Sequence, residues 1–192
     1  TLRAAIDWSW ELLPDAERVL LRRLAVFTGG ATQEAVQRVC ADAVVTADQV
    51  PDLVAALVDK SLLVVSGDER PRYRMLETIK AYGLERLDEA GEREALRRAH
   101  ATYFVELAET AEPHLRRAEQ LVWLRRLKAD HDNLNAALRG SIAAGDAQTA
   151  VHLVAAAGWY WWLGGHKAEA MELATEALAV PGAADDEARA TA

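Results

Sequence analysis

The sequence predicts a mainly α-helical protein with one β-hairpin in its first half. Apolar residues recur every three or four positions through most of the chain, which is the period of a helix with one buried face. Between residues 62 and 75 this pattern changes to two short strand-like runs separated by turn formers, and beyond Gly91 no strand signal returns. We therefore expect two units, residues 1–91 and 92–192.

The order of elements in residues 51–87 is the most informative part of the chain. Leu53, Val54 and Leu57 have helical spacing, residues 62–65 are a continuous apolar run, and residues 67–71 hold turn formers. Residues 72–75 then alternate polar with apolar, and a second helix is expected from residue 77 to a stop at Gly91. Helix, hairpin and helix in this order are the second half of a winged helix, a three-helix core with a β-hairpin wing.

Earlier residues supply the other helices of this unit. Residues 2–13, 14–27 and 32–41 each have a helical apolar face, and Thr32 is placed to cap the last of them. Asp48 or a neighbour should cap the helix that begins near Pro51. In the helix over residues 14–27 we expect the charged side chains to point outward, namely Glu17, Arg18, Arg22 and Arg23.

The second unit is predicted to be helical throughout. Apolar faces are marked by Leu96 to Ala111, by Leu121, Leu124 and Leu127, and by Leu134, Leu138 and Ile142. The last pair of helices carries small and aromatic residues close to the roughly 34-residue period of a tetratricopeptide repeat; they are Gly158, Trp161, Gly165, Ala170 and Ala177. Val154, Ala174 and Pro181 depart from that pattern. We expect a tetratricopeptide-like α-solenoid segment that continues past Ala192.

Composition excludes several classes of protein. No apolar run is long enough to cross a bilayer and the N-terminus is unlike a signal peptide, so we expect a cytoplasmic protein without membrane contact. A net charge of −8 argues against broad binding to nucleic-acid phosphates. The single cysteine, Cys40, lies on an apolar helix face and should be a buried structural thiol.

Several stretches together resemble a known family. They are DWSWELLPDAERVLLRRLAVFTGG, LVDKSLLVV, RYRMLETIKAYGLERL and WLRRLKADHDNLNAAL. They are similar to the AfsR-like and LuxR-like bacterial signal-transduction ATPases, whose nucleotide-binding module is of the NB-ARC (STAND) kind. The resemblance implies a DNA-binding effector, a P-loop ATPase, a winged helix and a helical repeat sensor, of which this chain would hold the last two. No P-loop motif is present, so ATP or ADP would bind an upstream ATPase domain and no cofactor would bind here.

The same resemblance implies a position near the nucleotide. In related switches a Met-His-Asp motif at the end of the wing contacts bound ADP, and the matching residues are Met75, Leu76 and Glu77. Because Leu76 cannot donate a hydrogen bond to phosphate, Arg72 or Arg74 would have to take over that contact.

A winged helix also suggests DNA binding, through the helix that precedes the wing. That helix carries Asp48, Asp52 and Asp59 against one base, Lys60, so we expect direct nucleic-acid binding to be disfavoured. The wing arginines at 70, 72 and 74 are the remaining argument for it.

A second candidate site is the sequence GWYWWLGG. If Trp161 is the core residue of the repeat, helical geometry places His152, Ala155, Trp159 and Trp162 on the concave face, where they could bind a peptide or a small apolar ligand. The alternative is that these rings pack against the preceding helices or against a following repeat.

No catalytic or metal site is predicted. His100 should be a hydrogen-bonded core residue, His131 looks like a helix start, and no histidine has a second ligand at metal-site spacing. We therefore expect a non-catalytic regulatory and sensor segment that couples binding of an inducer or protein partner on the repeats to the ATPase module. The alternatives are a tetratricopeptide interaction scaffold and a DNA-binding winged helix.

Overall fold

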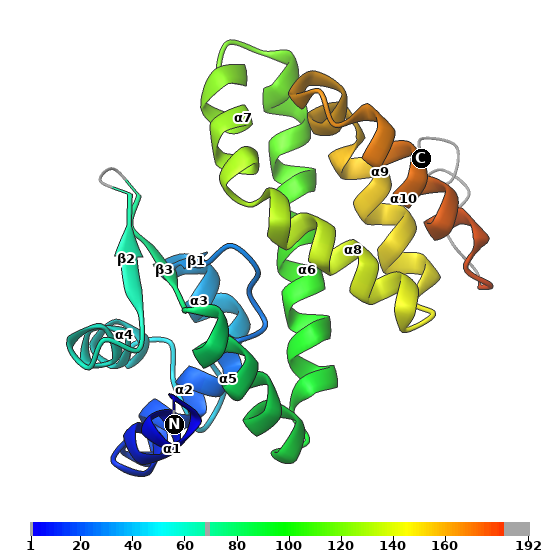
Figure 1. The fold of residues 1–192 in the computed structure, drawn as a ribbon. Coiled ribbons are helices and arrows are strands. Elements are labelled where there is room, and N and C mark those ends of the chain that lie inside the picture. The colour runs from blue at the N-terminus through cyan, green and yellow to red at the C-terminus, as the bar shows by residue number, and fades with distance from the viewer. Residues whose placement is uncertain (1, 68–69, 183–192) are drawn as a thin grey trace. The chain divides into compact units, whose positions relative to one another are not determined.

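The computed structural model describes residues 2–67 and 70–182, and the chain divides into two compact units, Thr1–Ala99 and His100–Ala192. Asp68 and Glu69 of the predicted turn, and any continuation of the repeats beyond residue 182, lie outside the described residues. Both units are mainly helical (Figure 1). No helix in the described ranges is long and apolar enough to span a membrane.

The first unit is a winged helix preceded by one extra helix. Its elements are α1 (Leu2–Glu11), α2 (Asp15–Leu24), β1 (Ala31–Thr32), α3 (Gln33–Cys40), α4 (Val50–Asp59), β2 (Val64–Ser66), β3 (Arg72–Arg74) and α5 (Glu77–Glu89). β3 is the central strand, antiparallel to both neighbours, and Tyr73 pairs with Ala31 on one side and Val65 on the other. The predicted hairpin is confirmed. Sequence analysis did not find β1, because two residues directly before a helix are too short to show a period.

The core of this unit lies between α2, α3, α4 and α5. Leu20, Val36, Leu57 and Leu87 are fully buried. α2 and α5 approach closely at Gly83, where an added Cβ would lie 2.9 Å from the Cβ of Ala25. A larger residue at this position would push the two helices apart.

Three details of the helix boundaries differ in outcome. The hydroxyl cap at Thr32 is confirmed, since its side chain accepts a hydrogen bond from the Ala35 amide at 3.2 Å. α2 ends at Leu24, three residues before the predicted end, because residues 25–27 form tight turns with hydrogen bonds from Val26 N to Arg23 O and from Phe27 N to Leu24 O. The N-cap of α4 is Gln49, a neighbour of Asp48, and makes no side-chain cap bond.

The expectation that the charged residues of α2 point outward is wrong for two of them. Glu17 is 6% exposed and Arg23 is 4% exposed. Each is buried with opposite charge beside it: Lys60 Nζ lies 2.9 Å from Glu17 Oε2, and Arg23 reaches Asp42 and Glu92. Ion pairing removes most of the penalty that excludes unpaired charges from a core.

The second unit consists of antiparallel helices. α6 (Arg93–Ala111) begins in the first unit and ends in the second, and it is followed by η1 (Glu112–Arg116), α7 (Gln120–Ala129), α8 (His131–Ala143), α9 (Ala147–Gly164) and α10 (Lys167–Ala179). α9 and α10 form a hairpin (Figure 1), and Gly165 ends α9 with a left-handed φ of 81°. Trp161 is 1% exposed, as expected for the core residue of this pair.

The buried faces of this unit are only partly those predicted. Leu134 and Leu138 are fully buried, and His100 is 3% exposed with Nε2 3.4 Å from Asn133 Oδ1. Leu121, however, is 66% exposed. α7 packs on η1 and α9 along one side, and in that arrangement Leu127 is the residue that becomes fully buried.

Candidate functional site

The residues predicted near a nucleotide all lie where the wing returns to the helical core. Arg72 and Arg74 belong to β3, Met75 and Leu76 form the connection, and Glu77 begins α5. Leu76 occupies the N-cap position and its side chain is 58% exposed. Only two residues separate β3 from α5, so the five residues lie close together at the edge where the wing joins the helix.

A small pocket of about 60 Å³ opens at this edge. Arg74, Met75 and Glu77 line it together with Gly30 and Lys80. Lys80 and Arg74 bring positive charge to its rim and Glu77 brings one carboxylate. Sequence analysis missed Gly30 and Lys80. Gly30 comes close to Arg74 only because β1 pairs with β3.

Gly30 is required at this pocket for two reasons. Its φ is +85°, which side chains rarely adopt, and an added Cβ would lie 2.6 Å from Arg74 Cγ and 2.8 Å from the Tyr73 carbonyl oxygen. The Arg74 side chain therefore passes directly over the Gly30 backbone, in space that a larger residue at position 30 would occupy.

The two candidate arginines have different surroundings. Arg72 is half-buried and donates a hydrogen bond from Nη2 to the Gly30 carbonyl at 2.9 Å, whereas Arg74 is exposed at the pocket. Pockets that hold whole small molecules measure about 300–1,000 Å³. The pocket beside Arg74 is far smaller, and its size suits one inserted side chain better than a nucleotide.

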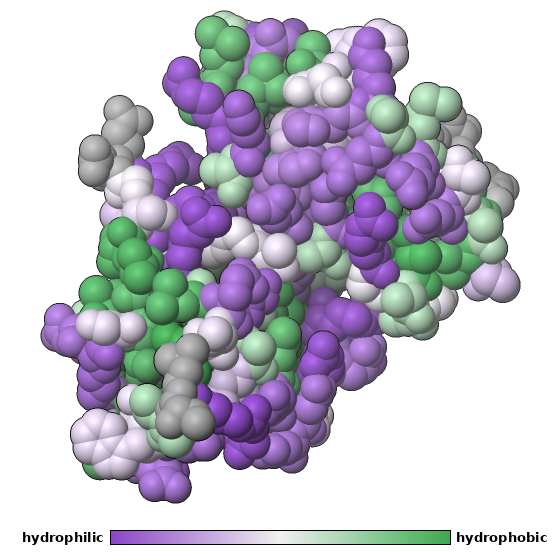
Figure 2. All heavy atoms as spheres, in the orientation of Figure 1, coloured by the Kyte–Doolittle hydropathy of each residue, from purple (hydrophilic) through white to green (hydrophobic). Residues whose placement is uncertain are grey.

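The helix before the wing presents negative charge. Asp48, Asp52 and Asp59 are exposed at or beside α4. Lys60, the one base in this stretch, is paired with Glu17. Figure 2 shows hydrophobic atoms gathered over the wing and α4 on the face in view, where Val64 and Val65 of β2 are 50% and 45% exposed. α4 is therefore acidic and β2 apolar, and the exposed bases that could contact phosphates in this region are Arg70 and Arg74 of the wing.

The predicted stripe on α9 is partly covered by cations. His152, Ala155 and Trp159 are half-buried, and Trp162 is 57% exposed. The Arg116 guanidinium of η1 lies 4.5 Å from the centroid of the Trp159 ring. Lys167 Nζ lies 3.5 Å from that of Trp162, so both indoles carry cation–π contacts. The sequence gives no sign of the Arg116 contact, because η1 and α9 are far apart along the chain.

Comparison with known proteins finds similarity to winged helix-turn-helix domains in the first unit. Residues 13–88 match a family described as a winged helix-turn-helix domain. The "Putative HTH-type transcriptional regulator Rv0890c" of Mycobacterium tuberculosis is 37% identical over 172 residues, which is 89% of this chain and 19% of that protein. The "Putative HTH-type transcriptional regulator Mb0914c" of Mycobacterium bovis gives the same values.

A shorter match covers half of the chain. The "Uncharacterized protein Rv0894" of Mycobacterium tuberculosis is 43% identical over 98 residues, 50% of this chain and 25% of that protein. No solved structure matches the chain. The chain thus spans about a fifth of the length of the regulators it matches over most of its residues. It carries a winged helix-turn-helix domain similar to those of proteins named as transcriptional regulators, which supports a regulatory role.

Proposed function

We propose that this chain is the non-catalytic regulatory and sensor segment of a larger transcriptional regulator. In this proposal the winged helix contacts a nucleotide-binding ATPase domain that precedes it, and the helical unit, a tetratricopeptide-like array, binds an inducer or a protein partner. The two sites communicate by shifting one two-state equilibrium between domains. ATP or ADP binds the ATPase domain and not this chain.

The observation that carries the proposal is the edge around Arg74. A pocket sized for one side chain, an exposed arginine and an exposed apolar Leu76 are features of a protein contact rather than of an enclosed ligand site. The acidic surface of α4 supports the same conclusion, because it disfavours DNA as the partner of this domain. Arg74 is the residue best placed to reach a neighbouring domain or its bound nucleotide.

The test uses the intact regulator and follows release of a fluorescent ADP analogue. Reversing the charge in Arg74→Glu should speed ADP release and raise basal ATP hydrolysis, because the contact that holds the resting state is lost. Arg98→Glu is the matched control, since Arg98 has a 64% exposed side chain on α6, remote from the pocket residues in sequence. Equal release rates in the wild type and both variants would contradict the proposal, as would an intact protein that binds no nucleotide.

On the helical unit we propose that the inducer or partner binds the stripe of His152, Ala155, Trp159 and Trp162. Trp162 is the exposed end of this stripe, and the Lys167 ammonium lies beside its ring. The pair would favour a ligand that carries an apolar group next to a negative charge. Trp162→Ala should abolish the response to inducer without changing nucleotide affinity in its absence. Met171→Ala, which removes an even more exposed apolar side chain from α10, is the control.

DNA binding by the winged helix is a second candidate, favoured by the helix-turn-helix family match. Its basic groups would be Arg70 and Arg74, both exposed on the wing. Duplex binding that weakens steeply with salt and disappears in the Arg70→Glu, Arg74→Glu double variant would establish it. Binding that is absent at low salt would leave the ATPase contact as the function of this surface.

A further inference from the structure

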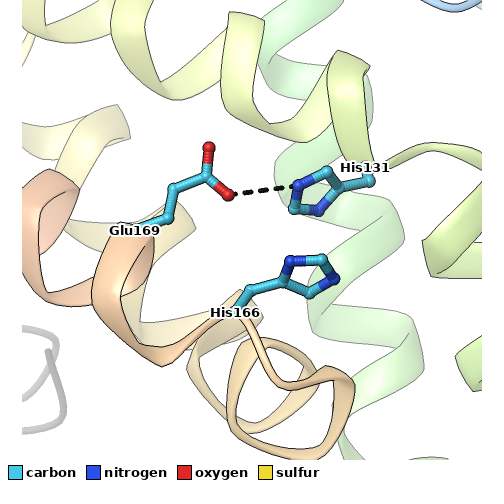
Figure 3. A group of neighbouring side chains, drawn as sticks. All are labelled: His131, His166 and Glu169. Atoms are coloured by element: carbon cyan, nitrogen blue, oxygen red, sulfur yellow. Dashed lines mark ion pairs between the residues drawn. The ribbon is translucent and has the colours of Figure 1, made fainter.

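Three potential metal ligands meet between α8 and α10 in the second unit (Figure 3). They are His131, His166 and Glu169, all half-buried, and their ligand atoms lie within 4.8 Å of one another. His131 Nε2 is 3.2 Å from Glu169 Oε2. The two imidazole rings are stacked with centroids 4.1 Å apart.

The fold assembles this cluster from distant parts of the sequence. His131 is the first residue of α8, His166 is the N-cap residue of α10, and Glu169 lies in the first turn of α10. The left-handed turn at Gly165 brings the chain back from α9 and sets His166 beside His131. The two histidines are 35 positions apart in the sequence, so ligand spacing along the chain could not predict the cluster.

Neighbouring side chains orient the ligands. Asn135 Nδ2 is 2.8 Å from Glu169 Oε1 and 3.1 Å from His131 Nε2. The reverse amide orientation would set an oxygen against the Glu169 carboxylate, so Nδ2 is the donor and His131 Nε2 accepts. In the tautomer with the proton on Nδ1, His131 can donate to the Tyr160 hydroxyl 3.1 Å away, and Nε2 keeps its lone pair.

This hydrogen-bond pattern is the one that metal-binding histidines use. A ligand histidine donates its second ring N–H to a neighbouring group, which fixes the tautomer and the ring, while the carboxylate ligand is held by a donor of its own. Tyr160 takes the first role here and Asn135 the second. His131 Nε2 has one lone pair, so binding a metal would exchange its contact with Asn135 for the ion; Glu169 Oε2 lies beside it and His166 borders the same space.

We propose that His131, His166 and Glu169 bind a divalent transition-metal ion, zinc in the first instance, which links α8 to α10. Two imidazoles and one carboxylate are a common donor set for zinc, with the fourth position taken by water or by a partner's side chain. At zinc–ligand distances of about 2.0–2.1 Å, tetrahedral ligand atoms lie about 3.3–3.5 Å apart. The His131–Glu169 distance of 3.2 Å is close to this value. Rotation of the half-buried His166 ring out of its stack on His131 would complete the site.

The test measures metal binding to the 192-residue chain after stripping with a chelator. Calorimetry should show one equivalent of Zn²⁺ bound, with a rise in melting temperature. Co²⁺ should give the intense visible absorption of a four-coordinate site. His166→Gln and Glu169→Gln each remove one ligand and should weaken Zn²⁺ binding by at least about 100-fold, the upper range for the loss of a mere supporting residue.

Two further variants separate a metal site from general effects. His114→Gln removes a histidine of the same unit outside the cluster and should bind Zn²⁺ as the wild type does. Tyr160→Phe keeps the ring in the core but removes the acceptor for His131, and it should weaken binding about 10-fold. Circular dichroism checks that each variant folds. If His166→Gln does not fold, Glu169→Gln alone tests the proposal.

Three outcomes would overturn the proposal. They are a wild-type chain that binds no Zn²⁺, equal binding by the wild type and Glu169→Gln, and an equal loss in His114→Gln. In each case the cluster would be a hydrogen-bonded contact between helices and nothing more.

Discussion

The two units join their helices with different polar chemistry. In the winged helix a guanidinium does so: Arg23 donates to the Cys40 carbonyl at 2.8 Å, to Asp42 at 2.7 Å and to Glu92 at 2.8 Å. In the helical unit the corresponding junction is made by imidazole, amide and phenol groups around His131. The first junction carries fixed charge over the whole physiological pH range, whereas the second contains the groups that we propose as metal ligands.

The electrostatics of the first junction follow from its hydrogen bonds. Bonds from Arg22, and secondarily from Arg23, lower the pKa of Glu92 from 4.5 to about 2 although burial opposes them. The pKa of Asp42 is lowered as well, chiefly by its bond from Arg23. Both carboxylates therefore stay ionised in any ordinary buffer.

The largest effect should come from removing Arg23. Its side chain is 5% exposed, and Arg23→Met removes the donor that it provides to the Cys40 carbonyl and to Asp42 and leaves Glu92 paired with Arg22 alone. We expect the winged helix to lose about 3–5 kcal/mol of unfolding free energy. Urea denaturation measures the loss, and hydrogen exchange on peptides from each unit locates it. Arg98→Ala, at an exposed ion pair, should cost less than about 1 kcal/mol. A similar small loss in Arg23→Met would mean that the junction is not a stabilising element.

Acid should reveal the same junction without mutation. The folded-state pKa of Glu92 is lowered, so its contribution is complete above pH 4.5 and is lost as the pH falls towards about 2. The free energy of unfolding of the winged helix should drop by about 2–3 kcal/mol over that range from this group. In Glu92→Gln this part of the pH dependence should disappear, and an unchanged profile would contradict the assignment.

In the helical unit a smaller loss is expected from Asn135→Leu. This change keeps a branched but larger side chain and removes the donor that holds Glu169 Oε1 and His131 Nε2. A part-buried carboxylate without its donor should cost about 1–2 kcal/mol. Hydrogen exchange in α10 should rise while exchange in α2 and α5 stays constant. Equal changes in both units would show that the two junctions are not independent.

The smallest effect is a pH response of the second unit near neutrality. Burial, then the neighbouring His131 and Lys128, lower the pKa of His166 below 6.5, with Glu169 acting in the opposite direction. Protonation therefore disfavours the fold, and stability that is complete above pH 6.5 should decline as the pH falls through that value. Exchange rates in α10 measured between neutral and mildly acidic pH test this. The response should vanish in His166→Gln and be absent from the winged helix.

The comparison also shows what sequence could predict. Local signals located the hairpin, the Thr32 cap and the buried Trp161, because each is set by residues a few positions apart. The same reasoning wrongly predicted that Arg23 points outward, since the period of α2 cannot reveal that Asp42 and Glu92 lie beside it. The histidine cluster and the Gly30 side of the pocket were missed for the same reason: they depend on contacts between distant segments.

The buried state of Cys40 makes the protein convenient for labelling. The thiol is 1% exposed, and burial raises its pKa well above the ordinary value, so maleimide reagents should not reach it in the folded chain. Because Cys40 is the one cysteine in the sequence, a new cysteine at exposed Ala55 and another at exposed Met171 would be the reactive pair. Fluorophores at these two sites would report, by energy transfer, the distance between the winged helix and the helical unit while a ligand is added. The native sequence thus provides a thiol-silent background for following the motion that a sensor would require.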